Sequence, residues 1–269
     1  MSGIEHAGRQ APETLGELSL HVVSRPSFDV AAMRTYLTSE NLKWRSSSAA
    51  SDAEHLVEVA GRLCYLSFGE RQSPKTNAEY ILNLIAHGHE SVLEHASWSF
   101  VLTGVSRGFS HQLVRHRVGF AFSQLSQQYR DHSGATSVMP EVLRNVPGAA
   151  AKWQEAITHS QQAYVDLLEL LEEIPHDLPP RERLRLIRTA ARSVLSAASE
   201  TKLLFSANAR ALRHFMRARG TIEGDEEMRR VSALLLGTME REAPSMFTDF
   251  RVEELADGLP VLRHTPHGG

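Results

Sequence analysis

Apolar residues recur every three or four positions along most of the chain, which is the spacing of helices that bury one face. The clearest case is residues 150–174, where the apolar positions are Trp153, Ile157, Tyr164, Leu167, Leu168 and Leu171. Ser51 and Thr76 each begin a further helix, because a glutamate follows each of them three positions later in a capping-box sequence. Other helices are predicted over residues 106–117 and 208–219. A further helix starts near Pro180 and carries apolar residues as far as Val194, and the last one carries Met228 to Met239 and is stopped by Pro244.

Three short segments alternate apolar and polar residues and are predicted to be strands: Leu18–Ser24, Ala96–Thr103 and Thr201–Phe205. They do not alternate with helices in the βαβ order of parallel sheets. The pattern therefore favours an α+β fold in a single domain over residues 18–255. Residues 1–17 and 256–269 lack apolar periodicity and are interpreted as tails.

Composition narrows the functional classes only slightly. The formal net charge of -3 argues against a general binder of polyanions. The sequence shows no signal peptide, and no apolar run approaches the roughly 18 residues of a membrane span. The single cysteine, Cys64, falls on the apolar stripe of a predicted helix, so a buried and inert thiol is expected. These features favour a soluble cytoplasmic protein in a reducing compartment.

Common cofactor motifs are missing from the sequence. It contains neither the G-x-G-x-x-G of dinucleotide-binding folds nor the P-loop of nucleotide triphosphatases. The histidines around His87 and His89 lack the H-E-x-x-H spacing of a zinc site, and one cysteine excludes a C-x-x-C pair. We therefore predict no metal centre.

A first cluster of polar residues begins at Gln112 and continues with Arg115, His116 and Arg117. Two arginines beside a histidine at a predicted helix end can bind a phosphate or an electron-rich ring. The following residues, Ser123, Gln124, Ser126 and Tyr129, offer neutral hydrogen-bonding groups. This combination suits a nucleotide, although a solvated basic helix end fits the residues equally well.

A second cluster lies on the predicted helix 208–219. In an ideal α-helix Arg210 and His214 are about 40° apart, whereas Asn208 and Arg219 share nearly the opposite side. Such a helix can lie between two ligand sites or two subunits; an exposed arginine-rich helix is the alternative.

A third cluster, residues 87–95, follows the end of a predicted helix at Gly88. Backbone amides and the side chains of His89 and Ser91 are suited to a phosphate or the edge of a flavin. Taken alone, this segment fits a structural turn with solvated histidines better.

Together the three clusters resemble the flavin-dependent thymidylate synthase family. The family hallmark is R-H-R, about seven residues, a serine and usually R-Y; here it reads Arg115-His116-Arg117 through Ser126 to Tyr129. The His89-Glu90-Ser91 turn and the N-x-R-x-x-x-H-F-x-x-x-R segment from Asn208 match in kind and order. The resemblance extends from about residue 57 to residue 250.

The resemblance implies helices packed around a small antiparallel sheet, a homotetramer with active sites at subunit interfaces, and methylation of a uridylate. FAD would be the cofactor, with methylenetetrahydrofolate as carbon donor and NADPH as reductant. The residues implied to hold FAD are His89, Ser91, Arg115, His116, Arg117, Gln124, Asn208, Arg210 and His214. Those implied to contact the nucleotide are Gln112, Ser126, Arg192 and Arg219, with Arg192 at the phosphate. Arg219 and Ser126 are the candidate catalytic residues, and Arg219 would stabilise charge on a pyrimidine carbonyl.

Two departures from the family pattern leave the nucleotide open. The gap between Arg117 and Ser126 is one residue longer than usual, and Gln128 replaces the arginine before Tyr129. UMP, with its additional 2′-hydroxyl, is therefore an alternative to dUMP. A nucleic-acid-binding module is a more distant alternative, because aromatic residues are scarce near Arg115 and Arg210.

Overall fold

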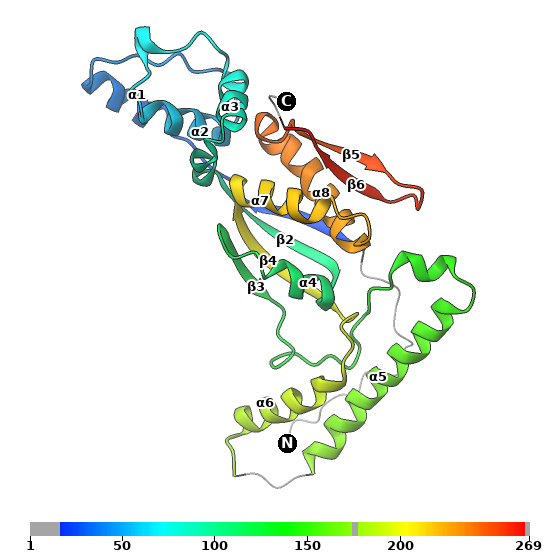
Figure 1. The fold of residues 1–269 in the computed structure, drawn as a ribbon. Helices are drawn as coiled ribbons and strands as arrows, with labels where there is room; N and C mark the ends of the chain where they lie inside the picture. The colour runs from blue at the N-terminus through cyan, green and yellow to red at the C-terminus, as the bar shows by residue number, and fades with distance from the viewer. Residues whose placement is uncertain (1–16, 174–176, 267–269) are drawn as a thin grey trace. The chain divides into compact units, whose positions relative to one another are not determined.

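A computed structural model describes residues 17–173 and 177–266 of the chain. The helices are α1 Val30–Ser39, α2 Asp52–Leu63, α3 Asn77–Ala86, α4 Arg107–Leu113, α5 Ala149–Glu172, α6 Pro180–Ala191, α7 Ala209–Phe215 and α8 Glu226–Glu242 (Figure 1). The strands are β1 Ser19–Ser24, β2 Ser97–Ser106, β3 Phe120–Gln124, β4 Glu200–Asn208, β5 Phe250–Glu254 and β6 Pro260–His264. A π-helical turn, Met216–Gly220, directly continues α7. The expected α+β class is confirmed.

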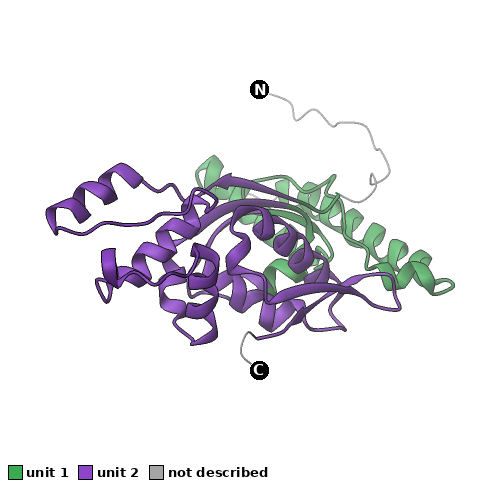
Figure 2. Cartoon of the chain, turned by 90° about the horizontal axis from the view of Figure 1, so that it is seen from above, with its two compact units in different colours: residues 1–19, 103–112, 124–202 green, residues 20–102, 113–123, 203–269 purple. Residues whose placement is uncertain are grey.

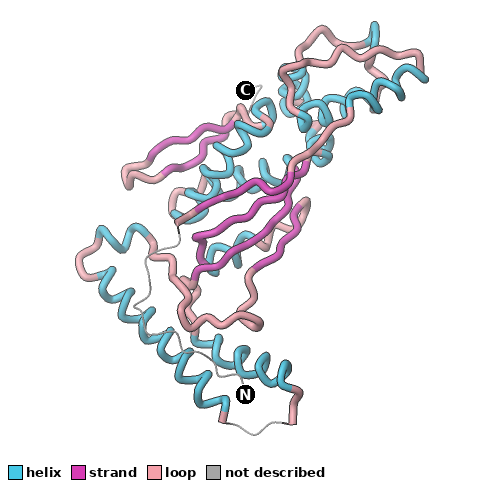
Figure 3. Tube along the Cα trace, turned by 180° about the vertical axis from the view of Figure 1, so that it is seen from behind, coloured by secondary structure: helices cyan, strands magenta, loops and turns pink. Residues whose placement is uncertain are grey.

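The main sheet is antiparallel, with its strands in the order β1-β2-β4-β3, and β5 pairs with β6 in a separate hairpin (Figure 3). Trp98, Phe100 and Leu102 alternate along β2 and are all buried, as their spacing predicts. The ring of Phe100 stacks on Phe205 of β4 at 5.0 Å. Gly104 in β2 has φ +71, and a Cβ there would lie 2.5 Å from the carbonyl of Glu17. The two chain segments can approach this closely only because Gly104 has no side chain.

Local capping signals fix the helix starts where the sequence predicts them. Ser51 and Thr76 both form complete capping boxes with Glu54 and Glu79, at the starts of α2 and α3. The hydroxyl of Ser106 accepts from the backbone of Phe109 at 2.9 Å and starts α4. Helix α4 ends at Leu113, earlier than the predicted position of about 117.

Several elements differ from the sequence prediction. Helix α1, strand β3 and strand β5 were not foreseen, and residues 260–264 of the expected C-terminal tail form β6. The expected N-terminal tail falls, apart from its last residue, outside the described residues. Cys64 is exposed rather than buried: α2 ends at Leu63, and the thiol donates to the carbonyl of Ala60 at 3.4 Å.

The chain divides into two compact units by its internal contacts (Figure 2). Unit 1 contains residues 103–112 and 124–202 with the described part of residues 1–19. Unit 2 contains residues 20–102, 113–123 and 203–269, of which those up to 266 are described. Neither unit is one continuous segment of the chain. The expectation of a single domain over residues 18–255 stays a prediction.

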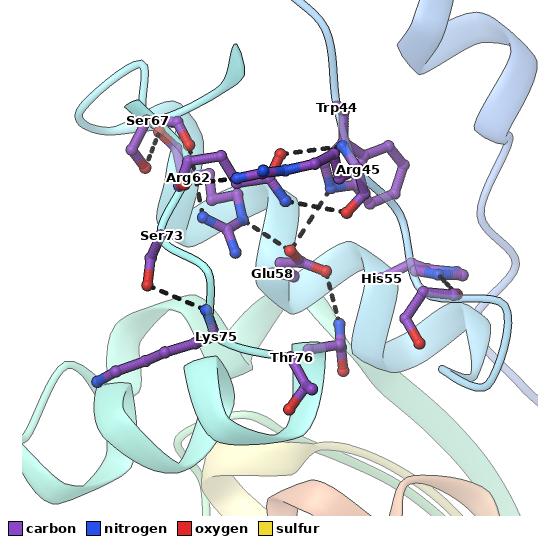
Figure 4. A network of polar contacts seen from close by, with 12 residues as sticks. Trp44, Arg45, His55, Glu58, Arg62, Ser67, Ser73, Lys75 and Thr76 are labelled. Atoms are coloured by element: carbon purple, nitrogen blue, oxygen red, sulfur yellow. Dashed lines mark hydrogen bonds and ion pairs between the residues drawn. The ribbon is translucent and has the colours of Figure 1, made fainter. Parts of the chain in front are cut away.

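A buried polar network joins α2 to α3 and to the segment before α2 (Figure 4). Glu58 lies at its centre and pairs with Arg62 at 2.6 Å, with both side chains almost fully buried. Asn77 donates to Glu58 at 2.8 Å, and the indole nitrogen of Trp44 lies 3.5 Å from the same carboxylate. The guanidinium of Arg62 lies 4.1 Å from the ring centre of Tyr80. The network fixes the packing of this helical part of unit 2.

Candidate active site

The Arg115–Arg117 tripeptide lies in the turn between α4 and β3, within unit 2. Arg115 and Arg117 are exposed, and neither guanidinium forms an ion pair with any residue of the described chain. His116 between them is half-buried. The three side chains therefore differ in environment: the guanidinium groups of Arg115 and Arg117 reach solvent, and the imidazole of His116 is directed into the protein.

The His116 imidazole is surrounded by residues from the 208–219 segment. Its ring packs edge-on against Phe215 at 5.2 Å and lies 5.9 Å from the ring of His214. Nε of Arg219 donates to Nε2 of His116 at 3.2 Å. Burial, together with the positive charges of Arg219 and His214, lowers the pKa of His116 below its ordinary value. The imidazole is thus neutral near pH 7, with an unprotonated nitrogen facing a guanidinium.

The π-helical turn explains how His214 and Arg219 both reach His116. In an ideal α-helix two residues five positions apart point about 140° away from each other. Hydrogen bonding from i to i+5, as in the turn Met216–Gly220, brings such residues towards the same face. The expectation that His214 and Arg219 occupy different faces is therefore wrong, because it assumed a regular α-helix.

Gly119 brings the turn close to the start of α7. It has φ +74, and a Cβ there would lie 2.7 Å from the side-chain nitrogen of Asn208 and 2.8 Å from the Cβ of Ala211. The backbone of Asn208 donates to the Gly119 carbonyl at 3.2 Å. The side-chain oxygen of Asn208 accepts from Ala211 at 2.9 Å and caps α7. Asn208 therefore fixes the helix start as well as facing the turn.

The turn that contains His89 and Ser91 is linked to the same segment by ion pairs. His89 and Ser91 are both exposed, at the start of the short 3-10 helix Glu90–His95. Glu90 pairs with Arg217 at 3.1 Å, and Glu94 pairs with Arg210. Arg210, a predicted cofactor residue, thus contacts this turn directly.

Unit 1 holds a second group of predicted residues. Nε2 of Gln124 donates to the hydroxyl of Ser110 at 2.8 Å and to that of Thr201 at 3.1 Å. The hydroxyl of Ser126 accepts from the backbone of Gln128 at 3.1 Å, in the turn after β3. Gln112 is exposed near the end of α4.

Arg107 is a candidate that the sequence analysis missed. Its guanidinium donates to the carbonyl of Leu125 at 3.2 Å, and burial together with the nearby charge of Arg192 lowers its pKa. Neither Arg107 nor Arg192 pairs with a carboxylate in the described ranges. Two neighbouring positive charges that pair with no carboxylate of the described residues form an attractive site for an anion. In the sequence, the indication of this site was an arginine that directly follows Ser106, the cap of the predicted helix.

The comparisons with known proteins agree with the predicted family. A family model described as thymidylate synthase complementing protein matches residues 47–245. A flavin-dependent thymidylate synthase of Mycobacteroides abscessus is 40% identical over 86% of this chain and 92% of its own length. The enzyme of Mycolicibacterium gilvum is 40% identical over 82% of this chain and 88% of its own length. That of Corynebacterium aurimucosum is 35% identical over 89% of this chain and 96% of its own length. The chain belongs to the flavin-dependent thymidylate synthase family.

In this family member the predicted site residues fall into two groups. Unit 2 contains His89, Ser91, Arg115, His116, Arg117, Asn208, Arg210, His214 and Arg219. Unit 1 contains Gln112, Gln124, Ser126 and Arg192, and the newly found Arg107. Within the described residues, no three His, Cys, Asp or Glu side chains are grouped as metal ligands. None of the helices over the same residues is both long and apolar enough to cross a bilayer.

Proposed function

We propose that this enzyme methylates C5 of dUMP to give dTMP, with FAD as bound cofactor, methylenetetrahydrofolate as carbon donor and NADPH as reductant. The observation that supports it most is the convergence of Arg219, His116 and His214, three residues that the family resemblance assigns to nucleotide and flavin. The relatives are named flavin-dependent thymidylate synthases, which supports a thymidylate synthase reaction and a flavin cofactor.

The residues of unit 2 fit a flavin dinucleotide. Arg115 and Arg117 offer exposed cations for its diphosphate, and the exposed His89 and Ser91 add hydrogen-bonding groups. His116 adds a flat neutral ring. FAD bound there would supply the reducing equivalents that turn a transferred one-carbon unit into a methyl group. Asn208, Arg210 and His214 complete the unit 2 residues of the proposed set; Gln124, which the resemblance also assigns to FAD, belongs to unit 1.

The residues of unit 1 suit a nucleoside monophosphate. Arg107 and Arg192 pair with no carboxylate in the described chain. Their positive charges are therefore available to bind a phosphate. Gln112 and Ser126 offer neutral groups for the rest of the nucleotide. The Ser126 hydroxyl accepts one hydrogen bond from Gln128 and keeps its own proton for donation, which suits a catalytic contact with the pyrimidine.

Arg219 is proposed to stabilise the pyrimidine as C5 attacks the carbon donor. Negative charge then develops on a ring carbonyl oxygen, and a guanidinium that is already fixed in place lowers the energy of that state. His116 accepts from Nε of Arg219, which leaves the two terminal nitrogens of the guanidinium free to donate to such an oxygen. We further propose a homotetramer with active sites at the subunit interfaces.

Release of tritium from C5 of labelled dUMP tests the proposal, with labelled UMP in parallel. We expect release and dTMP formation only when FAD, NADPH and methylenetetrahydrofolate are all present. Preference for UMP would keep the reaction class but change the substrate. The flavin assignment has its own test: Arg117→Ala should retain less FAD per chain after gel filtration, and equal FAD content in this variant and the unchanged protein would contradict it.

A further inference from the structure

We propose that Glu90 and Arg217 form a positioning pair that holds Arg219 and the His89–Ser91 turn in one arrangement. The inference rests on the proposed function, because it assigns these two residues to the same reaction. Neither residue is among those implied to touch flavin or nucleotide. Both act through their neighbours in the chain.

The contact between the two side chains has the geometry of a two-point clamp. Nη1 and Nη2 of Arg217 lie 3.1 and 3.2 Å from Oε1 and Oε2 of Glu90. The Glu90 side chain is only 14% exposed and that of Arg217 34%, so water competes weakly for the contact. Two parallel hydrogen bonds fix the mutual orientation of the groups as well as their separation.

The sequence positions of the pair give it its role. Glu90 lies between His89 and Ser91, the two residues proposed to contact FAD. Arg217 lies two residues before Arg219, inside the π-helical turn Met216–Gly220. The pair therefore joins the flavin turn to the segment that carries the proposed catalytic arginine.

Arg213 explains why Glu90 and Arg217 pair with each other. Arg213 is fully buried and binds both carboxylate oxygens of Asp249 at 2.6 Å. It lies 3.7 Å from Glu90 and adds a second positive charge beside that carboxylate. The charge on Glu90 is thus attracted from two sides, and only Arg217 is left to take both of its oxygens.

The far end of the π-helical turn is fixed by packing. A Cβ on Gly220 would lie 2.7 Å from Leu262 and 2.8 Å from Ser232, so the backbone there packs closely against these residues. The hydroxyl of Thr221 donates to the carbonyl of Arg217 at 2.9 Å. Arg219 thus lies between a tightly packed glycine and the Glu90 clamp, and loss of the clamp frees one side of it.

A double-mutant cycle of Glu90→Gln and Arg217→Gln on kcat for dUMP tests the pairing. We expect each single change to lower kcat roughly tenfold or more, since small misplacements of catalytic groups are costly. The double variant should be no worse than the singles, because the two residues act as a unit. The kcat of Arg217→Lys should lie between those of the unchanged protein and Arg217→Gln, because lysine keeps the charge but loses the two-point contact. The KM for dUMP should change less than kcat.

The matched control is the pair Arg25 and Glu242, which is joined at 2.9 Å in unit 2 and contains no site residue. Changing each of these to Gln should leave kcat within twofold. The inference would be overturned if the kcat of the single Glu90 and Arg217 variants also stayed within twofold of the unchanged protein. It would likewise be overturned if the losses of kcat in the two single variants multiplied in the double variant. An unchanged protein that is inactive on both dUMP and UMP counts against the proposed function instead.

A second readout needs no turnover. Histidine resonances of the full chain report the titration of His116, whose pKa is lowered by burial and, in addition, by the charge of Arg219. If Glu90→Gln releases Arg219, the His116 midpoint should rise towards its ordinary value, with the Arg25→Gln protein unchanged. An unmoved midpoint in Glu90→Gln would contradict the positioning role even if the enzyme proves inactive.

Discussion

Nε of Arg219 lies 3.2 Å from Nε2 of His116 and donates a hydrogen bond to it. The two residues are 103 positions apart in the sequence, yet both belong to segments that carry the family motifs. The contact requires His116 to be neutral, because a protonated Nε2 has no lone pair to accept with. It also fixes the tautomer, with the proton of the neutral ring on Nδ1.

Acid pH should weaken the protein through His116. Its folded pKa is lowered, while the unfolded chain takes up a proton near the ordinary value of 6.5. The contribution of His116 to the free energy of unfolding is therefore fully present above about pH 6.5 and declines as the pH falls towards the folded pKa. Urea unfolding between pH 5 and 8 should show this decline, and His116→Asn should show a shallower one. Equal slopes would contradict the assignment.

Arg219→Ala should nearly abolish methylation while FAD stays bound. Removing a preorganised donor to a developing oxyanion costs roughly 100- to 1,000-fold in kcat. Tritium release at saturating dUMP measures the loss, and flavin absorbance per chain reports the cofactor. Arg251→Ala, at an exposed arginine of β5, is the control and should retain full activity. Turnover that survives Arg219→Ala would show that this arginine does not stabilise the reaction.

Arg107→Gln should weaken nucleotide binding, as should Arg192→Gln. Each change removes one of the two cations proposed to meet the phosphate, and a hydrogen bond to a charged group contributes about 1.5–3 kcal/mol. That corresponds to an increase in the dissociation constant for dUMP of roughly tenfold or more, measurable by calorimetry. Deoxyuridine without phosphate should bind the variants and the unchanged protein equally. A larger loss for deoxyuridine than for dUMP would place the arginines elsewhere.

Glu58→Ala should destabilise unit 2 strongly. It leaves the buried Arg62 without its counter-ion, and removal of one partner from a buried pair costs about 3–5 kcal/mol. The matched control is Glu155→Ala, which breaks an exposed pair with Lys152 on α5 and should cost at most about 1 kcal/mol. The two free energies of unfolding come from urea titrations. Similar small losses in both variants would mean that Arg62 is solvated.

The sequence was sufficient where structure depends on neighbouring residues. Ser51 and Thr76 start α2 and α3 as predicted, because a capping box involves only four consecutive residues. The alternation of Trp98, Phe100 and Leu102 identified β2 for the same reason. The family resemblance rested on short motifs, and the comparisons confirm it.

Features that depend on distant residues could not be predicted. The C-terminal strand β6 is stabilised by pairing with β5 and has no strong pattern of its own. The π-helical turn changes the direction of Arg219, and periodicity at 100° per residue cannot detect it. Cys64 is exposed because α2 ends one residue before it. Arg107 became a candidate only through its proximity to Arg192.

The most direct test of the account is the product formed from dUMP by the purified full chain with FAD, NADPH and methylenetetrahydrofolate. The account predicts dTMP, in step with tritium release from C5, and loss of both in Arg219→Ala. Cys64→Ser should form dTMP at an undiminished rate, since the proposed reaction uses no thiol. A protein that binds flavin but forms neither dTMP nor methylated UMP, or one that needs Cys64 for turnover, would contradict it.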